Sequence, residues 1–144
     1  MFSNALRIGI VIALKVKKEE KMNFNTFTTK SQETIQLAQQ IAQEFGHSQI
    51  ENEHLFKALT QVDENVLPFL LKKLSIHTGV LYQILDKQLQ SFPKVSGAEL
   101  VLSREANKTL TESSVIAKKM NDEFVSIEHL IFAIFKSKSN IAQV

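Results

Sequence analysis

A ten-residue motif recurs with substitutions in this chain, and its repetition constrains the fold more than any other feature of the sequence. Residues 50–59, IENEHLFKAL, match residues 125–134, VSIEHLIFAI, at an offset of 75 positions. The same offset aligns residues 27–59 with residues 102–134 without a gap, with seven identities and conservatively matched apolar positions. A match of this length indicates two copies of one structural unit that pack against each other.

The apolar spacing within each copy is that of amphipathic helices. In the first copy, apolar residues recur at intervals of three and four, which predicts a helix with one buried face: Ile35, Ala38, Ile41, Ala42 and Phe45. Thr28 is its predicted N-cap and Gly46 its stop. A second helix begins within the repeated motif. Its Glu lies in the first turn, where the helix dipole favours an anion. Ser126 is the predicted N-cap of this helix in the second copy, and Glu51 takes that position in the first.

Two more helices are predicted in the first copy. One covers residues 65–74, with Pro68 in its first turn. The other covers residues 77–89 and is expected to bury five apolar residues: Val80, Leu81, Ile84, Leu85 and Leu89. Residues 92–101 contain Pro, Ser and Gly without an apolar period, which predicts a linker.

The predicted fold class is therefore all-α, with two pseudo-symmetric four-helix repeats. Repeat one covers residues 27–91 and repeat two covers residues 102–144. A complete second copy, at the offset of 75, would extend to about residue 166. We therefore expect the second repeat to be truncated at its C-terminus and the sequence to be a fragment of a longer protein.

The charge distribution separates residues 1–21 from the remainder. This segment holds five basic and two acidic residues, and its apolar run at residues 8–14 is too short to span a bilayer. We interpret it as an N-terminal extension outside the fold, which begins at residue 22. The remaining chain holds twelve basic and thirteen acidic residues, so no basic groove for nucleic acid is indicated, and no membrane partner is expected. The chain has no Cys, which excludes thiolate chemistry and fits a cytoplasmic location.

Two helical repeats that each place Glu-His-Leu at the start of the second helix resemble the Clp N-terminal domain, which caps AAA+ unfoldases. Three segments resemble the ClpB-type disaggregases in particular: FTTKSQETIQLAQQIA (27–42), FPKVSGAELVLS (92–103) and DEFVSIEHL (122–130). The similarity covers residues 22–144. It implies a non-enzymatic domain that binds exposed hydrophobic segments of unfolded or aggregated proteins. The alternative is a ClpA/ClpC-type domain that docks adaptors and delivers substrates to a Clp protease.

The same resemblance implies partners and a cofactor for the longer protein. Clients would pass to ATPase modules of the same polypeptide in a hexamer, with cooperation from a DnaK-type chaperone. ATP and magnesium would belong to those modules. None of the four glycines of this chain is followed by Lys, so the phosphate-binding loop Gly-x-x-x-x-Gly-Lys is absent and no cofactor is expected here.

The repeated histidines do not have the spacing of a metal site. A helical zinc site needs His at i and i+4, but Ala58 follows His54 and Ala133 follows His129 at that distance. We interpret both histidines as packing at the junction between the repeats. No nucleophile motif accompanies the carboxylates, so no catalytic residue is predicted.

The candidate client-binding residues come from the resemblance. It implies a chaperone role for Thr28, Asp122 and Glu128, and an apolar groove between the repeats, for which Leu110 and His129 are candidates. Plain structural roles remain open for each: an N-cap for Thr28, a solvated loop and helix start for the two acidic residues, and ordinary core for Leu110. Periodicity alone does not distinguish a core face from a groove.

Overall fold

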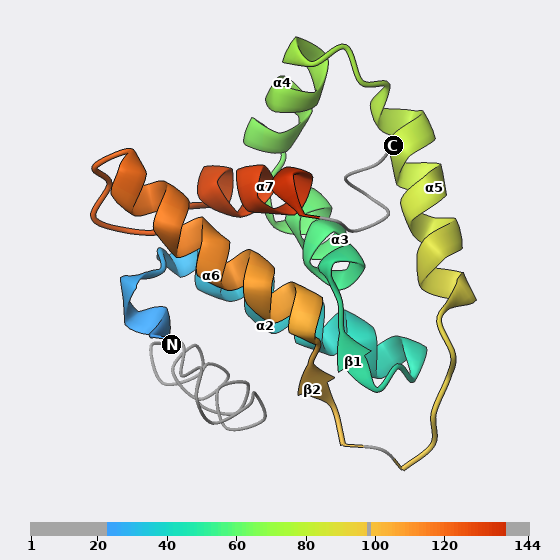
Figure 1. Ribbon diagram of the computed structural model, residues 1–144. Helices are drawn as coiled ribbons and strands as arrows, with labels where there is room; N and C mark the ends of the chain where they lie inside the picture. The colour runs from blue at the N-terminus through green and yellow to red at the C-terminus, as the bar shows by residue number, and fades with distance from the viewer. Residues whose placement is uncertain (1–22, 98, 138–144) are drawn as a thin grey trace.

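The computed structural model describes residues 23–97 and 99–137, and within them the chain is mostly helical with little strand (Figure 1). A short 3-10 helix, η1 (Phe24–Thr26), precedes six α-helices. Their bounds are α2 (Thr29–Phe45), α3 (Asn52–Val62), α4 (Val66–Lys73), α5 (Thr78–Ser91), α6 (Arg104–Lys119) and α7 (Ile127–Lys136). Two strands of two residues each, β1 (Gln49–Ile50) and β2 (Val101–Leu102), complete the elements. The predicted extension and the end of repeat two lie outside the described residues.

The internal repeat of the sequence is also a repeat of structure. Helices α2 and α3 of repeat one begin at residues 29 and 52, and helices α6 and α7 of repeat two begin at residues 104 and 127, again 75 positions later. Within each repeat the two helices pack on each other, α2 on α3 and α6 on α7. Across the repeats, α3 packs on α6 and α7 packs on α2. The predicted pseudo-symmetric all-α fold is confirmed.

Short backbone pairings join the two repeats, and the sequence did not predict them. Strand β1 pairs in parallel with β2, which places Ile50 opposite Leu102. A second parallel bridge places Phe27 opposite Val125. These four positions are related by the repeat offset, because residue 27 corresponds to 102 and residue 50 to 125. Each repeat therefore supplies one extended partner to the other, in a pseudo-two-fold arrangement.

One continuous core lies between the helices and includes side chains from both repeats. Helix α5 contributes Leu81, Leu85 and Leu89, spaced by four along one face, and it packs on α3. The prediction that Val80 is buried was wrong, because its side chain lies off this row and is 51% exposed. Helix α4 packs on α7, so it also bridges the two repeats (Figure 1). No described helix has both the length and the apolar character needed to cross a membrane.

Candidate functional site

The side chain of each repeated histidine caps the first turn of its own helix. The backbone N–H of Glu51 donates to Nδ1 of His54 at 2.8 Å, and the backbone N–H of Ser126 donates to Nδ1 of His129 at 2.9 Å. Each His stands three residues after its cap residue, which is the position of Glu or Gln in an ordinary capping box. A His three residues after a predicted N-cap is the sequence signal for this contact, and the contact was not predicted from it.

The second ring nitrogen of each histidine reaches the residue seven positions earlier. Because Nδ1 accepts a backbone N–H, the proton of the neutral ring is on Nε2. His54 Nε2 therefore donates to Nδ1 of His47 at 2.8 Å, and His129 Nε2 donates to Oδ2 of Asp122 at 2.8 Å. Positions 47 and 122 are equivalent under the repeat offset. The two repeats share one geometry but fill the acceptor position with different chemistry.

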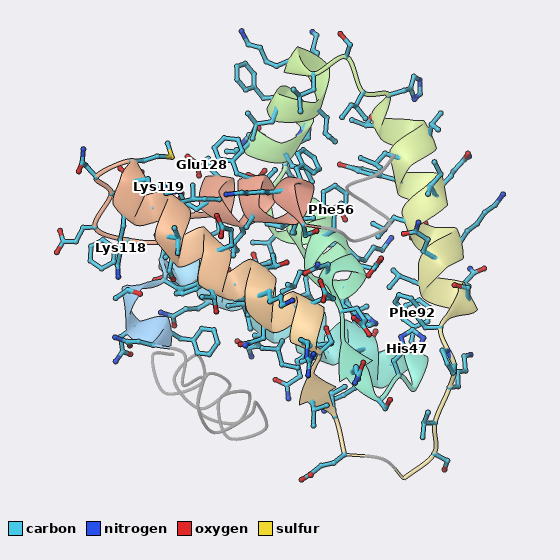
Figure 2. All side chains as sticks on the ribbon, viewed as in Figure 1. His47, Phe56, Phe92, Lys118, Lys119 and Glu128 are labelled. Atoms are coloured by element: carbon cyan, nitrogen blue, oxygen red, sulfur yellow. The ribbon has the colours of Figure 1, made fainter. Side chains whose placement is uncertain are left out.

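In repeat one this site is covered by the linker. The His47 ring stacks on Phe45, with centroids 5.1 Å apart, and meets Phe92 of the linker edge-on at 5.5 Å. Figure 2 shows His47 and Phe92 next to each other at the end of α5. Burial and the neighbouring His47 lower the pKa of His54 to about 3. Burial also raises the pKa of Glu53, with a smaller contribution from Glu51, and the Glu53 side chain is only 5% exposed.

Among the described residues, the side chains around the equivalent site of repeat two are exposed. We define the open loop surface as Met120, Asp122, Phe124 and Glu128, all of which are exposed. Met120 is 52% and Phe124 49% exposed, which is unusual for large apolar side chains. Figure 2 shows Glu128 at the end of the molecule where α6 finishes with Lys118 and Lys119. The surface therefore combines apolar side chains with carboxylates and adjacent ammonium groups.

Thr28 lies against the same loop from the other repeat. Its backbone N–H donates to the carbonyl of Val125 at 3.0 Å. Its hydroxyl caps α2 by accepting from the backbone N–H of Ser31 at 3.1 Å, and the Ser31 hydroxyl donates to the same Val125 carbonyl at 2.9 Å. The predicted N-cap role of Thr28 is confirmed. The structure thus brings Thr28 together with the loop that carries Asp122 and Glu128.

The other two predicted residues do not form an accessible groove. Leu110 is fully buried in the core on α6, so the interpretation of this side chain as groove surface is wrong for the described structure. Its apolar period reflected core packing, which was the alternative left open by the sequence. His129 is also buried, and its ring holds Asp122 and the start of α7 through hydrogen bonds. His54, in contrast, does contact the linker, with its ring centroid 5.8 Å from that of Phe92.

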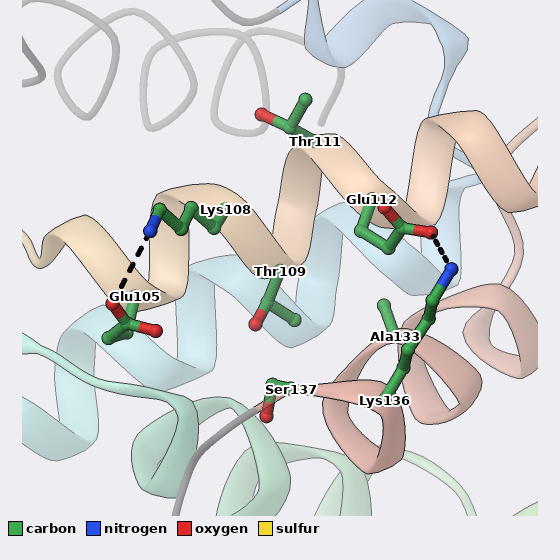
Figure 3. A pocket seen from close by; sticks show the side chains of 8 residues that line it. All are labelled: Glu105, Lys108, Thr109, Thr111, Glu112, Ala133, Lys136 and Ser137. Carbon is green, nitrogen blue, oxygen red and sulfur yellow. Dashed lines mark hydrogen bonds and ion pairs between the residues drawn. The ribbon is translucent and has the colours of Figure 1, made fainter.

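A polar hollow of about 550 Å³ lies between α6 and the end of α7 (Figure 3). Two ion pairs border it, Lys108–Glu105 at 3.8 Å and Lys136–Glu112 at 2.8 Å. None of the predicted client-binding residues lines this hollow. Within the described ranges, no group of three or more His, Asp or Glu side chains is arranged to hold a metal ion.

The fold and the site together define an all-helical double-repeat domain whose second repeat presents an open loop surface. This chain belongs to the Clp repeat N-terminal domain family, whose sequence profile matches residues 26–144. The resemblance to the Clp N-terminal domain, inferred from the repeated motif, is therefore confirmed.

Its curated relatives include ClpB chaperones. The chain is 42% identical over 123 residues to the chaperone protein ClpB of Bacteroides thetaiotaomicron, a match that covers 85% of this chain and 14% of that protein. It is 37% identical over 117 residues to ClpB of Porphyromonas gingivalis, with 81% and 14% covered. The chain thus spans about a seventh of the length of these relatives.

Solved structures share the fold. The N-terminal domain of Hsp104 from Candida albicans superimposes with a TM-score of 0.74 at 23% identity, covering 81% of this chain and 77% of that one. The N-terminal domain of the ClpV1 ATPase from Escherichia coli superimposes with a TM-score of 0.72 at 17% identity, covering 99% and 77%. At these identities the likeness concerns the fold alone.

Proposed function

We propose that this domain engages protein clients for a ClpB-type, ATP-dependent protein disaggregase and catalyses no reaction itself. It binds the hydrophobic segments that unfolded or aggregated proteins expose. The observation that carries the proposal is the open loop surface of repeat two, with Met120 and Phe124 half exposed beside two carboxylates. Exposed apolar side chains with a polar rim are typical of surfaces that bind other proteins.

The difference between the repeats supports this assignment. Phe45, the equivalent of Met120, is partly buried against the core, and Glu53, the equivalent of Glu128, is buried. If the site in repeat two had only a structural role, it would not need exposed apolar residues. Repeat one therefore acts as scaffold, and repeat two contacts the client.

The residues of the site have different roles in this proposal. Phe124 and Met120 contact apolar client side chains, while Asp122 and Glu128 contact polar groups at the rim. His129 orients the Asp122 carboxylate through its Nε2–H, and Thr28 holds the loop through Val125. His129 and Thr28 are thus positioning residues. Leu110 supports the site only as core.

The longer protein supplies what this domain lacks. In the proposal, clients pass to ATPase modules of the same polypeptide, which use ATP and magnesium, and a DnaK-type chaperone cooperates with the whole machine in the cytoplasm. The sequence relatives are ClpB chaperones, which favours this assignment over an adaptor-docking domain of the ClpA/ClpC type.

Binding to a permanently unfolded protein tests the proposal. A reduced and carboxymethylated client is titrated with the 144-residue chain and with Phe124→Ser. We expect the variant to raise Kd about tenfold, because burial of a phenyl ring contributes roughly 1.5–3 kcal/mol. The matched control is Phe69→Ser, which removes a ring of similar exposure, 58% against 49%, from α4 of repeat one.

The control separates a specific surface from general stickiness. An unchanged Kd for Phe69→Ser together with a weakened Phe124→Ser supports the open loop surface. Equal effects of the two variants, or no effect of Phe124→Ser in a folded chain, would contradict it. Circular dichroism of both variants confirms that each remains helical.

A further inference from the structure

The linker is held at two points by a short segment of repeat one. The backbone N–H of Val95 donates to the carbonyl of Gly46 at 2.9 Å, and the backbone N–H of Val101 donates to the carbonyl of Ser48 at 3.1 Å. His47 lies between these two carbonyls in the sequence, and its ring contacts Phe92. The linker contact therefore depends on the position of residues 46–48, and His47 is the side chain at its centre.

The protons of the two imidazoles follow from their partners. His54 accepts at Nδ1 from the N–H of Glu51, so it carries its proton on Nε2 and donates to His47 Nδ1. His47 then carries its own proton on Nε2, which is buried without a hydrogen-bond partner in the described structure. Both rings are neutral, and each unprotonated nitrogen is already an acceptor.

An additional proton has no place in this arrangement. On His54 Nδ1 it would face the N–H of Glu51, and on His47 Nδ1 it would face the Nε2–H of His54. Lys94 of the linker adds a positive charge, and the uncharged ring of Phe45 on α2 stacks on His47. Glu51 and Glu53 flank His54 at the start of α3, but the Glu53 carboxyl is itself buried, and burial raises its pKa. Burial first, and then Lys94, lower the pKa of His47.

Repeat two contains the same geometry, including the backbone N–H on the histidine Nδ1, but it lacks the conflict at the acceptor of the Nε2–H. Asp122 replaces His47 as the acceptor for the histidine Nε2–H, and its carboxylate is 48% exposed. An anion in this position is compatible with a protonated imidazole. The two repeats therefore differ at this acceptor, which is His47 in the repeat that the linker covers and Asp122 in the other.

We propose that the neutral His47–His54 couple is an acid-sensitive latch, which holds linker residues 92–95 on repeat one and releases them when the His47 ring is protonated. The latch breaks at the His54–His47 hydrogen bond, because a proton on His47 Nδ1 would face the Nε2–H of His54. Movement of the His47 ring removes its contact with Phe92, and displacement of residue 46 loosens the bond from Val95. Repeat two keeps its fold during this opening.

Amide hydrogen exchange in the 144-residue chain tests the latch. The protection factor of the Val95 N–H, corrected for intrinsic exchange, is measured by NMR between pH 7.5 and pH 5. Burial and then Lys94 hold the pKa of His47 below its ordinary value of 6.5 in the closed state, and release returns the pKa to that value. We expect protection to fall by up to about 30-fold at pH 5, because protonation of His47 then favours the open state.

A second amide distinguishes local opening from unfolding. The Thr28 N–H, which bonds to Val125, reports the contact between the repeats. Its protection factor should change less than threefold over the same range. Constant protection at Val95 would overturn the proposal, and so would an equal fall at Val95 and Thr28.

Variants taken from the chain itself sharpen the test. His47→Asp gives repeat one the acceptor of repeat two, and we expect it to abolish the fall in Val95 protection. His77→Asn is the control, because it replaces an exposed histidine that caps α5 with another good cap and should keep the fall. If His47→Asp does not fold, the ring nitrogen shifts of the unmodified chain decide instead. His54 must show a bare Nδ1 at pH 7.5, and a proton on that atom would overturn the latch.

Discussion

At the scale of single residues, the two repeats keep backbone geometry where they do not keep residue type. Gly46 ends α2 with φ of 74°, and Asn121, its equivalent after α6, has φ of 59°. Both values lie in the left-handed region, which Gly enters freely and Asn enters more readily than other residues. Both repeats therefore make the same left-handed turn after their first helix, and each copy places a different residue at the position of positive φ.

This equivalence predicts opposite effects of two substitutions. Gly46→Ala should destabilise the fold by about 1 kcal/mol, because a Cβ makes positive φ costly. The new Cβ would meet only Lys94 Cβ, at 3.9 Å, so the backbone accounts for the cost. Asn121→Gly should be neutral or slightly stabilising. Urea denaturation of both variants measures the effects, and a Gly46→Ala variant as stable as the unmodified chain would contradict this explanation.

Residue types alone predicted part of the site and misplaced the rest. Thr28 as an N-cap was predictable, because a Thr before an apolar helical period is a local signal. Leu110 was not, because a core face and an exposed groove have the same period, and only the packing of the second repeat decides between them. The His47–His54 couple was also missed, because nothing in the sequence indicates that an imidazole at position 47 meets one at position 54.

At the scale of elements, the first helix of each repeat has an equivalent cap. The Thr28 hydroxyl accepts from the N–H of Ser31 at 3.1 Å, and the Ser103 hydroxyl accepts from the N–H of Ala106 at 3.0 Å. The cap of α2 lies against the open loop surface through Val125, whereas the cap of α6 follows β2, which pairs with β1. Variants at the two caps can therefore distinguish an effect on helix stability from an effect on client binding.

Alanine at each cap tests this separation. Thr28→Ala and Ser103→Ala should each lower the free energy of unfolding by about 1 kcal/mol, the usual cost of losing an N-cap. Only Thr28→Ala should also weaken binding of the unfolded client. The backbone N–H of residue 28 remains in this variant, but the Thr28 hydroxyl that donates to the Ser31 hydroxyl is lost, and Ser31 bonds to the Val125 carbonyl of the loop. Thr28→Ser keeps the hydroxyl and should restore both properties. A Thr28→Ala variant that is destabilised but binds normally would limit Thr28 to a structural role.

The extent of each helix was easier to predict than its contacts. The helices of repeat one begin within one or two residues of their predicted positions, because caps, Pro68 and Gly46 are local signals. The buried face of α5 was harder to predict, since five apolar residues shared its pattern and only three face the core. Exposed Val80 shows that a neighbouring element, not the helix itself, selects the buried row.

At the scale of the whole molecule, each repeat depends on the other to complete its backbone bonding. The N–H of Thr28 donates to the carbonyl of Val125, and at the equivalent position the N–H of Ser103 donates to the carbonyl of Ile50 at 3.1 Å. The gapless offset in the sequence predicted two units but gave no sign of this exchange. Such pairing joins residues far apart in the chain, and two-residue strands are too short to leave an alternating pattern.

The shared core and the exchanged strands predict a single unfolding transition. Leu59→Ala on α3 and Leu110→Ala on α6 each remove a fully buried side chain, one from each repeat. Each should lower the free energy of unfolding by about 2–5 kcal/mol, with the spread set by how far the cavity collapses. Because neither repeat can bury its apolar face alone, both variants should shift the same transition.

Calorimetry distinguishes one cooperative unit from two. The ratio of van't Hoff to calorimetric enthalpy should be close to one in the unmodified chain and in both variants. Exchange protection should fall equally at Thr28 and Ser103, whichever leucine is replaced, because their N–H groups bond across the repeats. Two separate transitions, with Leu59→Ala moving one and Leu110→Ala moving the other, would mean that the repeats fold independently and that their exchanged bonds contribute little.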